Sequence, residues 1–266
     1  MVLQDVKTAL ITGASSGIGL EIANVFAKKG FNLILISRSE DKLNNISSFL
    51  EKEYGVNIKI ITKDLIQDNS AEEIYKEIKS SRINIDVLIN NAGVGYSGLF
   101  HNIDIEKDIE VIKINIETLT RLTKLFSKDM IDRGGGKILN IASTGAYQPG
   151  PYISVYYAAK SYILSFSLAI RNELKDYGVD VCVLCPGATR TQFSKNAGKA
   201  DIKKSMLPEE VAKAAFKGLE RNKAVIIPGL FNKIAIVFSK LAPGYISAKI
   251  VRKIQESMVK NFRKSK

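Results

Sequence analysis

The sequence predicts an α/β fold, a doubly wound parallel sheet of about seven strands with helices on both faces and a helical extension at the C-terminus. Short runs rich in Ile, Val and Leu alternate with longer stretches of helical spacing along the chain. The runs are almost continuously apolar, as strands are when helices cover both faces of a parallel sheet. Repeated strand, helix and strand units give parallel strands joined by right-handed crossovers.

Apolar runs that are expected to form the strands recur throughout the chain. In order they are Thr8–Ile11, Asn32–Ser37, Asn57–Ile61, Asp86–Ile89, Lys137–Ile141, Asp180–Leu184 and Ala224–Ile227. Helix signals lie between them, because Ser70 with Glu73 is typical of a capping box and Pro208 suits a first helical turn. The glycines at which helices are expected to stop are Gly30, Gly55 and Gly178.

The 266 residues contain no linker, low-complexity tract or repeat, and α/β folds often use a chain of this size for one domain. We therefore expect a single domain over residues 1–266, with a substrate lid at 190–207 and a helical tail at 230–266. In the tail, apolar residues recur at helical spacing on either side of Pro243-Gly244, which predicts two amphipathic helices. These residues are Phe231, Ile234, Phe238 and Leu241, then Ile246, Ile250, Ile254 and Met258.

The formal net charge of +12 is distributed unevenly. Residues 1–189 hold 21 Lys and Arg against 22 Asp and Glu, whereas residues 190–266 hold 18 against 5. The excess therefore belongs to the lid and the tail. Such a region is typical of a solvated face, or of a surface that attracts an acidic substrate, anionic lipid or nucleic acid. Nucleic acid is disfavoured, because the region lacks interleaved aromatic residues and a known reading motif.

Composition favours a cytoplasmic protein. A hydrophobic content of 45% with charges of both signs excludes a disordered or collagen-like chain. Charges within Met1 to Leu10 do not fit a signal peptide, and later apolar stretches fall short of the ~18 residues of a membrane span. Cys182 and Cys185 are expected to be buried free thiols in a reducing compartment, since strand residues three apart point to opposite faces. The lone His101 offers no metal cluster, and no metal is expected.

A glycine-rich loop follows the first strand and leads into a helix at Leu20. Glycines let the backbone turn sharply and approach a pyrophosphate, whose charge the free N–H groups of a helix N-terminus hold. A tight turn without a ligand is the alternative, which the position between first strand and first helix disfavours. The dinucleotide contacts expected in this loop are Gly13, Ser15, Ser16, Gly17, Ile18 and Gly19.

The end of the second strand indicates which dinucleotide binds. An acidic residue there would hold the ribose 2′-hydroxyl of NAD, whereas an arginine accommodates the 2′-phosphate of NADP. The strand ends in Ile36-Ser37-Arg38, with no carboxylate. We therefore expect NADP(H) to be preferred over NAD(H), with Arg38 at the phosphate; an ordinary surface arginine is the alternative.

Tyr156 and Lys160 lie four residues apart on one face of a predicted helix, and Ser143 lies just past the fifth strand. An adjacent ammonium favours the phenolate and lowers a tyrosine pKa that is otherwise ~10. Such a tyrosine can act as acid and base near neutral pH. The pair alone is a weak signal, but it is strong in combination with the glycine loop.

Together these motifs resemble the classical short-chain dehydrogenase/reductase family, from about Lys7 to Gly229. The interval between Ser143 and Tyr156 also matches, which favours Tyr156 over its neighbours Tyr152 and Tyr157. Further matching residues are Asp64 after the third strand, Asn90-Asn91-Ala92-Gly93 after the fourth, Asn115, and Pro186-Gly187 with Thr189 and Thr191 after the sixth. The resemblance implies a Rossmann-type fold and an oxidoreductase that interconverts a carbonyl and an alcohol by hydride transfer.

The same resemblance implies roles for the matching residues. Tyr156 would protonate the substrate oxygen, Lys160 would bind the nicotinamide ribose and tune Tyr156, and Ser143 would hydrogen-bond the carbonyl. Asn115 would hold a water in a proton relay, while Asp64 and the Leu65 backbone would meet the adenine. The other implied cofactor contacts are Asn91, Ala92 and Gly93 beside the adenosine, and Pro186, Gly187, Thr189 and Thr191 at the nicotinamide and phosphates.

The resemblance also bears on substrate and assembly. The tail continues past the end of the tetrameric bacterial 3-oxoacyl reductases, which favours a homodimer through the helices around Asn115 and Tyr156. It is similar to the tails of members that handle bulky apolar carbonyls. The tail helices are expected to pack on the sheet; the alternatives are a cover over the active-site mouth and contact with an anionic membrane. The cations available for that contact are Lys249, Arg252, Lys253, Lys260, Arg263 and Lys264.

An enzyme is the leading hypothesis, and a dinucleotide-binding sensor or scaffold without chemistry is the alternative. The enzyme requires all four of Asn115, Ser143, Tyr156 and Lys160, whereas the sensor has no evident need for them together. The intact set therefore favours an NADP(H)-dependent carbonyl reductase or alcohol dehydrogenase.

Overall fold

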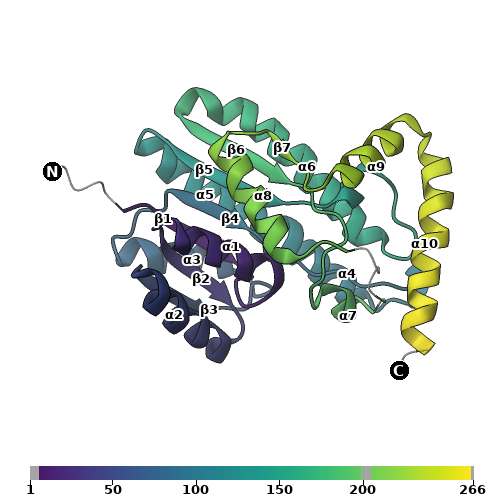
Figure 1. Ribbon diagram of the computed structural model, residues 1–266, viewed down its shortest axis with the longest axis horizontal. Helices are drawn as coiled ribbons and strands as arrows, with labels where there is room; N and C mark the ends of the chain where they lie inside the picture. Colours follow the sequence, from purple (N-terminus) through teal and green to yellow (C-terminus); the bar gives the residue numbers. More distant parts are fainter. Residues whose placement is uncertain (1–5, 199, 201–204, 265–266) are drawn as a thin grey trace.

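A seven-stranded parallel sheet forms the centre of the structure, in the order β3-β2-β1-β4-β5-β6-β7 (Figure 1). The computed structural model describes residues 6–198, 200 and 205–264. The strands are β1 Thr8–Thr12, β2 Asn32–Ser37, β3 Ile58–Thr62, β4 Val87–Asn90, β5 Gly136–Ile141, β6 Val179–Leu184 and β7 Val225–Ile226. Every strand falls on a predicted apolar run and every pairing is parallel, so the predicted fold class is confirmed.

The strand order reverses direction between β1 and β4, which are paired through Ala9 and Val87. From β1 the chain builds outward to β3, then returns to β4 and builds outward on the other side to β7. In open sheets of this kind, ligands bind outside the carboxyl ends of the strands at this switch point. The loops that leave β1, β4, β5 and β6 all emerge at that edge.

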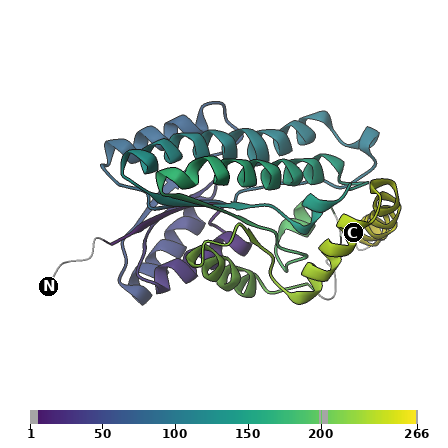
Figure 2. The same ribbon diagram turned by 90° about the horizontal axis from the view of Figure 1, so that it is seen from above.

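Helices cover both faces of the sheet, as the view in Figure 2 shows. On one face lie α1 Gly17–Lys28, α2 Glu40–Tyr54 and α8 Pro208–Glu220, and on the other α3 Ser70–Ser80, α5 Leu119–Asp132 and α6 Ser154–Leu174. The hydrophobic core on the α1 face contains Phe26, whose ring packs edge to face against those of Phe31 and Phe216, with ring centroids 5.0 Å apart in each pair. The core on the α5 face contains Phe126, whose ring centroid lies 5.4 Å from that of Tyr75. With both faces covered, continuous apolar strands are stable.

The predicted helix ends are confirmed at the glycines, whereas the capping box is wrong. Gly30, Gly55 and Gly178 all have positive φ, a conformation that glycine adopts without a Cβ penalty. Pro208 begins α8 as predicted. Ser70 does not cap α3, because it is the first helical residue and its hydroxyl donates to the Leu65 carbonyl at 3.3 Å.

A buried polar network joins β4 and β5 to the helices above them. The Asn90 side chain donates to Asn140 Oδ1 at 2.8 Å and to Thr123 of α5 at 3.0 Å. Asn140 in turn donates to Ser167 of α6 at 2.9 Å. Because a buried polar group without a partner is costly, these bonds specify how α5 and α6 sit on the sheet.

The tail forms the two predicted helices, α9 Leu230–Leu241 and α10 Gly244–Lys264, beside the sheet at the right of Figure 1. The expectation that their apolar residues pack on the sheet is wrong. Phe231, Phe238 and Leu241 are 84%, 68% and 77% exposed. The residues that α9 and α10 bury are instead Ile236, Ser247, Val251, Gln255 and Val259. Among the described residues, no helix combines the length and hydropathy that a membrane crossing requires.

We expect Asn140→Ala to lower the free energy of unfolding by about 3 kcal/mol, because it removes the buried amide that accepts from Asn90 and donates to Ser167. Urea denaturation followed by circular dichroism measures this. Asn261→Ala, at an exposed position of α10, is the matched control and should change little. Equal stability of the two variants would contradict the structural role of the network.

Candidate active site

The glycine loop after β1 adopts the conformation that its glycines permit. Gly13 has φ +67° and Gly17 has φ +57°, both in the left-handed region that other residues rarely adopt. A Cβ on Gly13 would lie 2.9 Å from the Ala92 backbone, and one on Gly17 would lie 3.0 Å from Thr191. The loops after β1, β4 and β6 therefore meet at the switch point, as the predicted cofactor contacts require.

Asn91 locks the glycine loop to the loop after β4. Its side-chain amide donates to the carbonyls of Thr12 and Gly13 at 2.9 and 3.2 Å. The Thr12 hydroxyl accepts from the backbone N–H groups of Asn91 and Ala92, each at 3.0 Å. Gly19 lies against the Gly13 carbonyl and the side-chain amide of Asn91, since a Cβ on Gly19 would overlap both.

The start of α1 fits an anionic group. Its N-cap is Ser16, whose side chain makes no capping hydrogen bond, and its first turn carries no acidic residue. A helix N-terminus in this condition offers backbone N–H groups and a partial positive charge to a phosphate. Ser15 and Ser16 are accessible there, while Ile18 packs against the core. With the left-handed glycines, this end of α1 suits the pyrophosphate of a dinucleotide.

The residues predicted for the adenosine end lie on the neighbouring strands. Arg38 is exposed just past β2, and its charge acts on Tyr96 in the loop after β4. Burial and the Glu110 carboxylate dominate at Tyr96 and raise the pKa of that phenol to about 12. Asp64 accepts from the Ile66 N–H at 3.2 Å, and Leu65 is buried. Both follow β3 at the same edge of the sheet.

The predicted catalytic residues Ser143, Tyr156 and Lys160 come together where β5 ends and α6 begins. Lys160 is 4% exposed, and its ammonium donates to the Ile141 carbonyl at 2.7 Å. The same ammonium lies 5.4 Å from the centre of the Tyr156 ring. Ser143, at the N-terminus of a short 3-10 helix, accepts from the Gly145 N–H at 3.1 Å and interacts with the Tyr156 phenol.

Burial sets the protonation of both groups in the protein alone. Burial lowers the pKa of Lys160 to about 8. Burial likewise raises the pKa of Tyr156, with a smaller opposing contribution from Ser143. The expected lowering of the Tyr156 pKa by Lys160 is therefore wrong for the protein by itself, because desolvation of the phenolate outweighs the nearby cation.

Asn115 lies in a π-helical segment, Lys113–Thr118, between α4 Ile105–Ile112 and α5. Its side chain is fully buried, accepts from the Val94 N–H at 3.1 Å and donates to the Val94 carbonyl at 2.9 Å. A Cβ on Gly93 would lie 2.9 Å from Asn115 Oδ1 and 3.4 Å from Lys160 Nζ. Asn115 thus holds the loop after β4 against Lys160, and its predicted role in a water relay stays a prediction.

The loop after β6 closes the site from the other side. The carbonyl of Pro186 accepts from the Thr144 N–H at 2.9 Å, and Gly187 packs against Asn232 of α9. The Thr189 hydroxyl donates to the Gly187 carbonyl, and the Thr191 hydroxyl accepts from the Phe193 N–H. Within the predicted lid at 190–207, the Arg190 N–H donates to the Met206 carbonyl, and positions 199 and 201–204 lie outside the described residues.

Several residues at the site are missing from the sequence-based prediction. Phe193, which begins α7 Phe193–Asn196, places its ring 5.0 Å from that of Tyr156. Gly95 lies under both rings, and a Cβ there would lie 2.8 Å from Tyr156. Gln255 of α10 donates to the Tyr157 hydroxyl at 3.1 Å. Spacing along the chain carries no signal for such contacts, because the partners belong to distant elements.

The cysteines and the histidine singled out in the sequence lie as follows. Cys182 and Cys185 are buried free thiols as predicted, and burial raises the pKa of each to about 11. His101 is exposed in the short 3-10 helix Phe100–Asn102.

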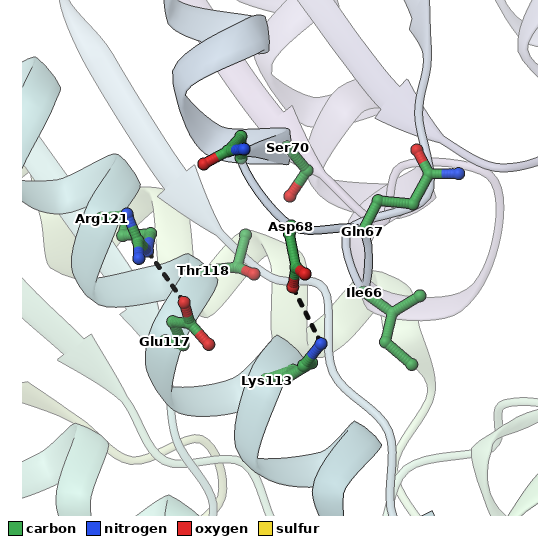
Figure 3. A pocket seen from close by; sticks show the side chains of 9 residues that line it. Ile66, Gln67, Asp68, Ser70, Lys113, Glu117, Thr118 and Arg121 are labelled. Carbon is green, nitrogen blue, oxygen red and sulfur yellow. Dashed lines mark hydrogen bonds and ion pairs between the residues drawn. The ribbon is translucent and has the colours of Figure 1, made fainter. Parts of the chain in front are cut away.

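A small pocket beside the π-helical segment (Figure 3) is lined by ion pairs of Lys113 with Asp68 and Arg121 with Glu117, at 2.9 and 3.0 Å. The charges of these four side chains therefore compensate one another within the pocket.

Comparison with known proteins agrees with this geometry. The sequence profile described as short chain dehydrogenase matches residues 7–202. The chain belongs to the short-chain dehydrogenase family. Human very-long-chain 3-oxoacyl-CoA reductase is 33% identical over 258 residues, which cover 94% of this chain and 80% of the relative. As a short-chain dehydrogenase, the protein is an NAD(P)-dependent oxidoreductase that acts on CH–OH or C=O groups.

Two solved structures are similar to this chain over most of their length, the first of them a short-chain dehydrogenase. One, from Sphingobium yanoikuyae in complex with NADPH, has a TM-score of 0.81 and 32% identity, and the match covers 89% of this chain and 95% of that one. The other is the bulky-bulky ketone specific alcohol dehydrogenase from Comamonas testosteroni, with a TM-score of 0.78 and 32% identity, covering 90% and 94%.

Gly19→Ala is expected to weaken NADPH binding about tenfold or more, because the added Cβ displaces the Gly13 carbonyl and the Asn91 amide that shape the loop. Titration of NADPH fluorescence gives the dissociation constant. Gly244→Ala, where a Cβ meets nothing within 4 Å, is the control. An unchanged dissociation constant for Gly19→Ala would show that this loop does not position the dinucleotide.

Proposed function

We propose that this short-chain dehydrogenase is an NADP(H)-dependent reductase that interconverts a bulky apolar ketone and its alcohol. The observation that carries the proposal is the arrangement of Tyr156 between Ser143 and the buried ammonium of Lys160, beside the glycine loop. A phenol with a hydroxyl on one side and an ammonium on the other is equipped for proton transfer to a carbonyl oxygen.

A nicotinamide cofactor bound beside Lys160 would supply the hydride in reduction and accept it in oxidation. Tyr156 donates its proton to the substrate oxygen during reduction and takes it back during oxidation. Its raised pKa keeps the phenol protonated near neutral pH, which suits the donor role in reduction. The Ser143 hydroxyl donates a hydrogen bond to the same oxygen. Lys160, fixed by the Ile141 carbonyl, is placed to bind the nicotinamide ribose.

NADP(H) is the proposed cofactor because of Arg38. It is exposed immediately after β2, where an arginine can meet a 2′-phosphate, and Ser37 carries no charge that would repel one. The solved relative from Sphingobium yanoikuyae contains NADPH, which supports the same preference. Asp64, Leu65, Asn91, Ala92 and Gly93 complete the proposed adenosine side of the site.

A bulky apolar substrate is supported by the site and by the relatives. Aromatic rings of Tyr157 and Phe193 flank Tyr156, at centroid distances of 6.2 and 5.0 Å. One curated relative is human very-long-chain 3-oxoacyl-CoA reductase, and one solved relative is a bulky-bulky ketone specific alcohol dehydrogenase. We therefore propose that the substrate is a ketone with large apolar groups or a 3-oxoacyl thioester.

Homodimerisation through the helices around Asn115 and Tyr156 is part of the proposal. The outer faces of α4 and α6 carry exposed apolar side chains, among them Ile109, Tyr162 and Leu168. On α6 the rings of Tyr162 and Phe166 stack at 5.5 Å. Pairing of two copies through these faces would remove the exposed apolar side chains from water.

Tyr156→Phe is expected to reduce NADPH-dependent turnover about 10³-fold while the dissociation constant of NADPH stays within about twofold, because only the transferable proton is lost. Ketones, aldehydes and 3-oxoacyl thioesters of increasing size serve as substrates, and NADPH oxidation is followed by absorbance. Tyr157→Phe, the adjacent tyrosine, should keep most of the activity. The reverse pattern would assign the acid to Tyr157 and refute the proposal.

Arg38→Ala is expected to raise the KM for NADPH about tenfold or more and to leave the KM for NADH nearly unchanged, because a guanidinium binds a phosphate through charge-assisted hydrogen bonds. Arg221→Ala, an exposed arginine after α8, is the control. A wild-type enzyme that prefers NADH would overturn the cofactor assignment.

A further inference from the structure

The two tail helices expose an apolar surface that the rest of the described chain leaves uncovered. We call it the α9–α10 surface. Its side chains are Leu230, Phe231, Ile234, Val237, Phe238, Leu241, Tyr245, Ile246, Ile250 and Ile254, each at least 39% exposed. Large apolar patches on a soluble protein mark interaction sites, whereas single exposed apolar residues do not.

The helical geometry makes this surface continuous along α10. Ser247, Val251, Gln255 and Val259 recur every fourth residue and form the buried stripe of α10. Ile246, Ile250 and Ile254 recur with the same period one residue earlier, so they form a parallel stripe on the outside. On α9 only Ile236 is buried, and the outer residues Phe231 and Phe238 are 84% and 68% exposed.

Positive charges flank the apolar residues. Six exposed cations lie between Leu230 and Phe262, against one carboxylate, Glu256. They are Lys233, Lys240, Lys249, Arg252, Lys253 and Lys260. Glu256 pairs with Lys260 at 2.8 Å, and Lys240 lies over the Tyr147 ring. No carboxylate of the described residues lies within ion-pair distance of the other four.

We propose that the α9–α10 surface docks the protein on an anionic lipid bilayer. Exposed apolar side chains bordered by lysine and arginine characterise helices that lie in a membrane interface, where the apolar face enters the acyl boundary and the cations meet phosphates. A second copy of the chain fits less well, since it would bring its own six cations against these six. The positive charge of the α9–α10 surface thus favours an anionic partner, and the continuous apolar stripe of α10 favours lipid as that partner.

Docking would place the active-site mouth at the membrane. Ser239 of α9 donates to Gln148 at 2.8 Å, and Gln255 of α10 donates to Tyr157, the neighbour of the catalytic tyrosine. Both partners belong to the segment between β5 and the start of α6. Delivery of an apolar ketone from the bilayer is a consequence that rests on the proposed function, whereas the docking itself does not.

Vesicle flotation of the full chain without substrate tests the proposal. Vesicles of phosphatidylcholine alone are compared with vesicles that also contain phosphatidylserine. We expect the bound fraction to be about tenfold higher on the anionic vesicles and to fall as salt is raised. Equal binding to both vesicles, or no binding to either, would overturn the proposal.

Paired variants separate the apolar and cationic contributions. Phe231→Ser with Phe238→Ser, and Lys249→Gln with Lys253→Gln, should each reduce binding to the anionic vesicles about tenfold. The controls are Phe49→Ser, which is 59% exposed on α2, and Lys42→Gln with Lys52→Gln on the same helix. All seven substituted positions are solvent-exposed, and circular dichroism verifies folding.

Light scattering distinguishes docking on lipid from pairing with a second copy of the chain. A dimer that dissociates in the Phe231→Ser, Phe238→Ser variant would place a second copy on this face and overturn the membrane assignment. Unchanged mass, together with the loss of vesicle binding, would support it. Because no turnover is measured, failure here leaves the proposed reductase activity untouched, and failure of that activity leaves the docking untouched.

Discussion

The site depends on one buried ammonium. Lys160 is buried, and its ammonium donates to the backbone carbonyl of Ile141 at the end of β5. A charge in such a place is stable only with partners close by, and the same burial lowers the pKa of Lys160. This contact ties the first turns of α6 to the edge of the sheet and thereby fixes Tyr156. Gly93 and Asn115 close the same space from the opposite side.

Buried hydrogen bonds make the scaffold rigid around the proposed catalytic residues. The Asn90 and Asn140 side chains connect β4 and β5 to α5 and α6 through bonds that are fully buried. Those elements carry or adjoin Asn115, Ser143 and Tyr156. The glycine loop is likewise held from below by Thr12 and Asn91, so its backbone keeps a shape that a phosphate can enter. Two separate polar networks therefore position the glycine loop and the elements around Tyr156.

Sequence patterns predict most of this arrangement, because parallel strands place their following loops at one edge. Gly13, Asn91, Ser143 and Thr191 lie together for that reason, and their positions after apolar runs are visible in the chain. Contacts between distant elements are different: nothing in the spacing of Phe193 or Gln255 indicates that they touch Tyr156 and Tyr157. The tail shows the same limit, since the period of Phe231, Ile234 and Phe238 predicts an apolar helix face but not what covers it. Ser70 shows that a capping bond can be replaced by a hydrogen bond to the preceding loop, here to the Leu65 carbonyl.

The contacts of α10 join the start of α6 to the segment after β6. Gln255 holds Tyr157 on α6, and the Met258 carbonyl accepts from the Ala200 N–H of the segment after β6 at 3.2 Å. One helix thus bridges the start of α6, next to Tyr156, and the segment after β6. A movement of α10 would therefore shift Tyr157 and Ala200 together.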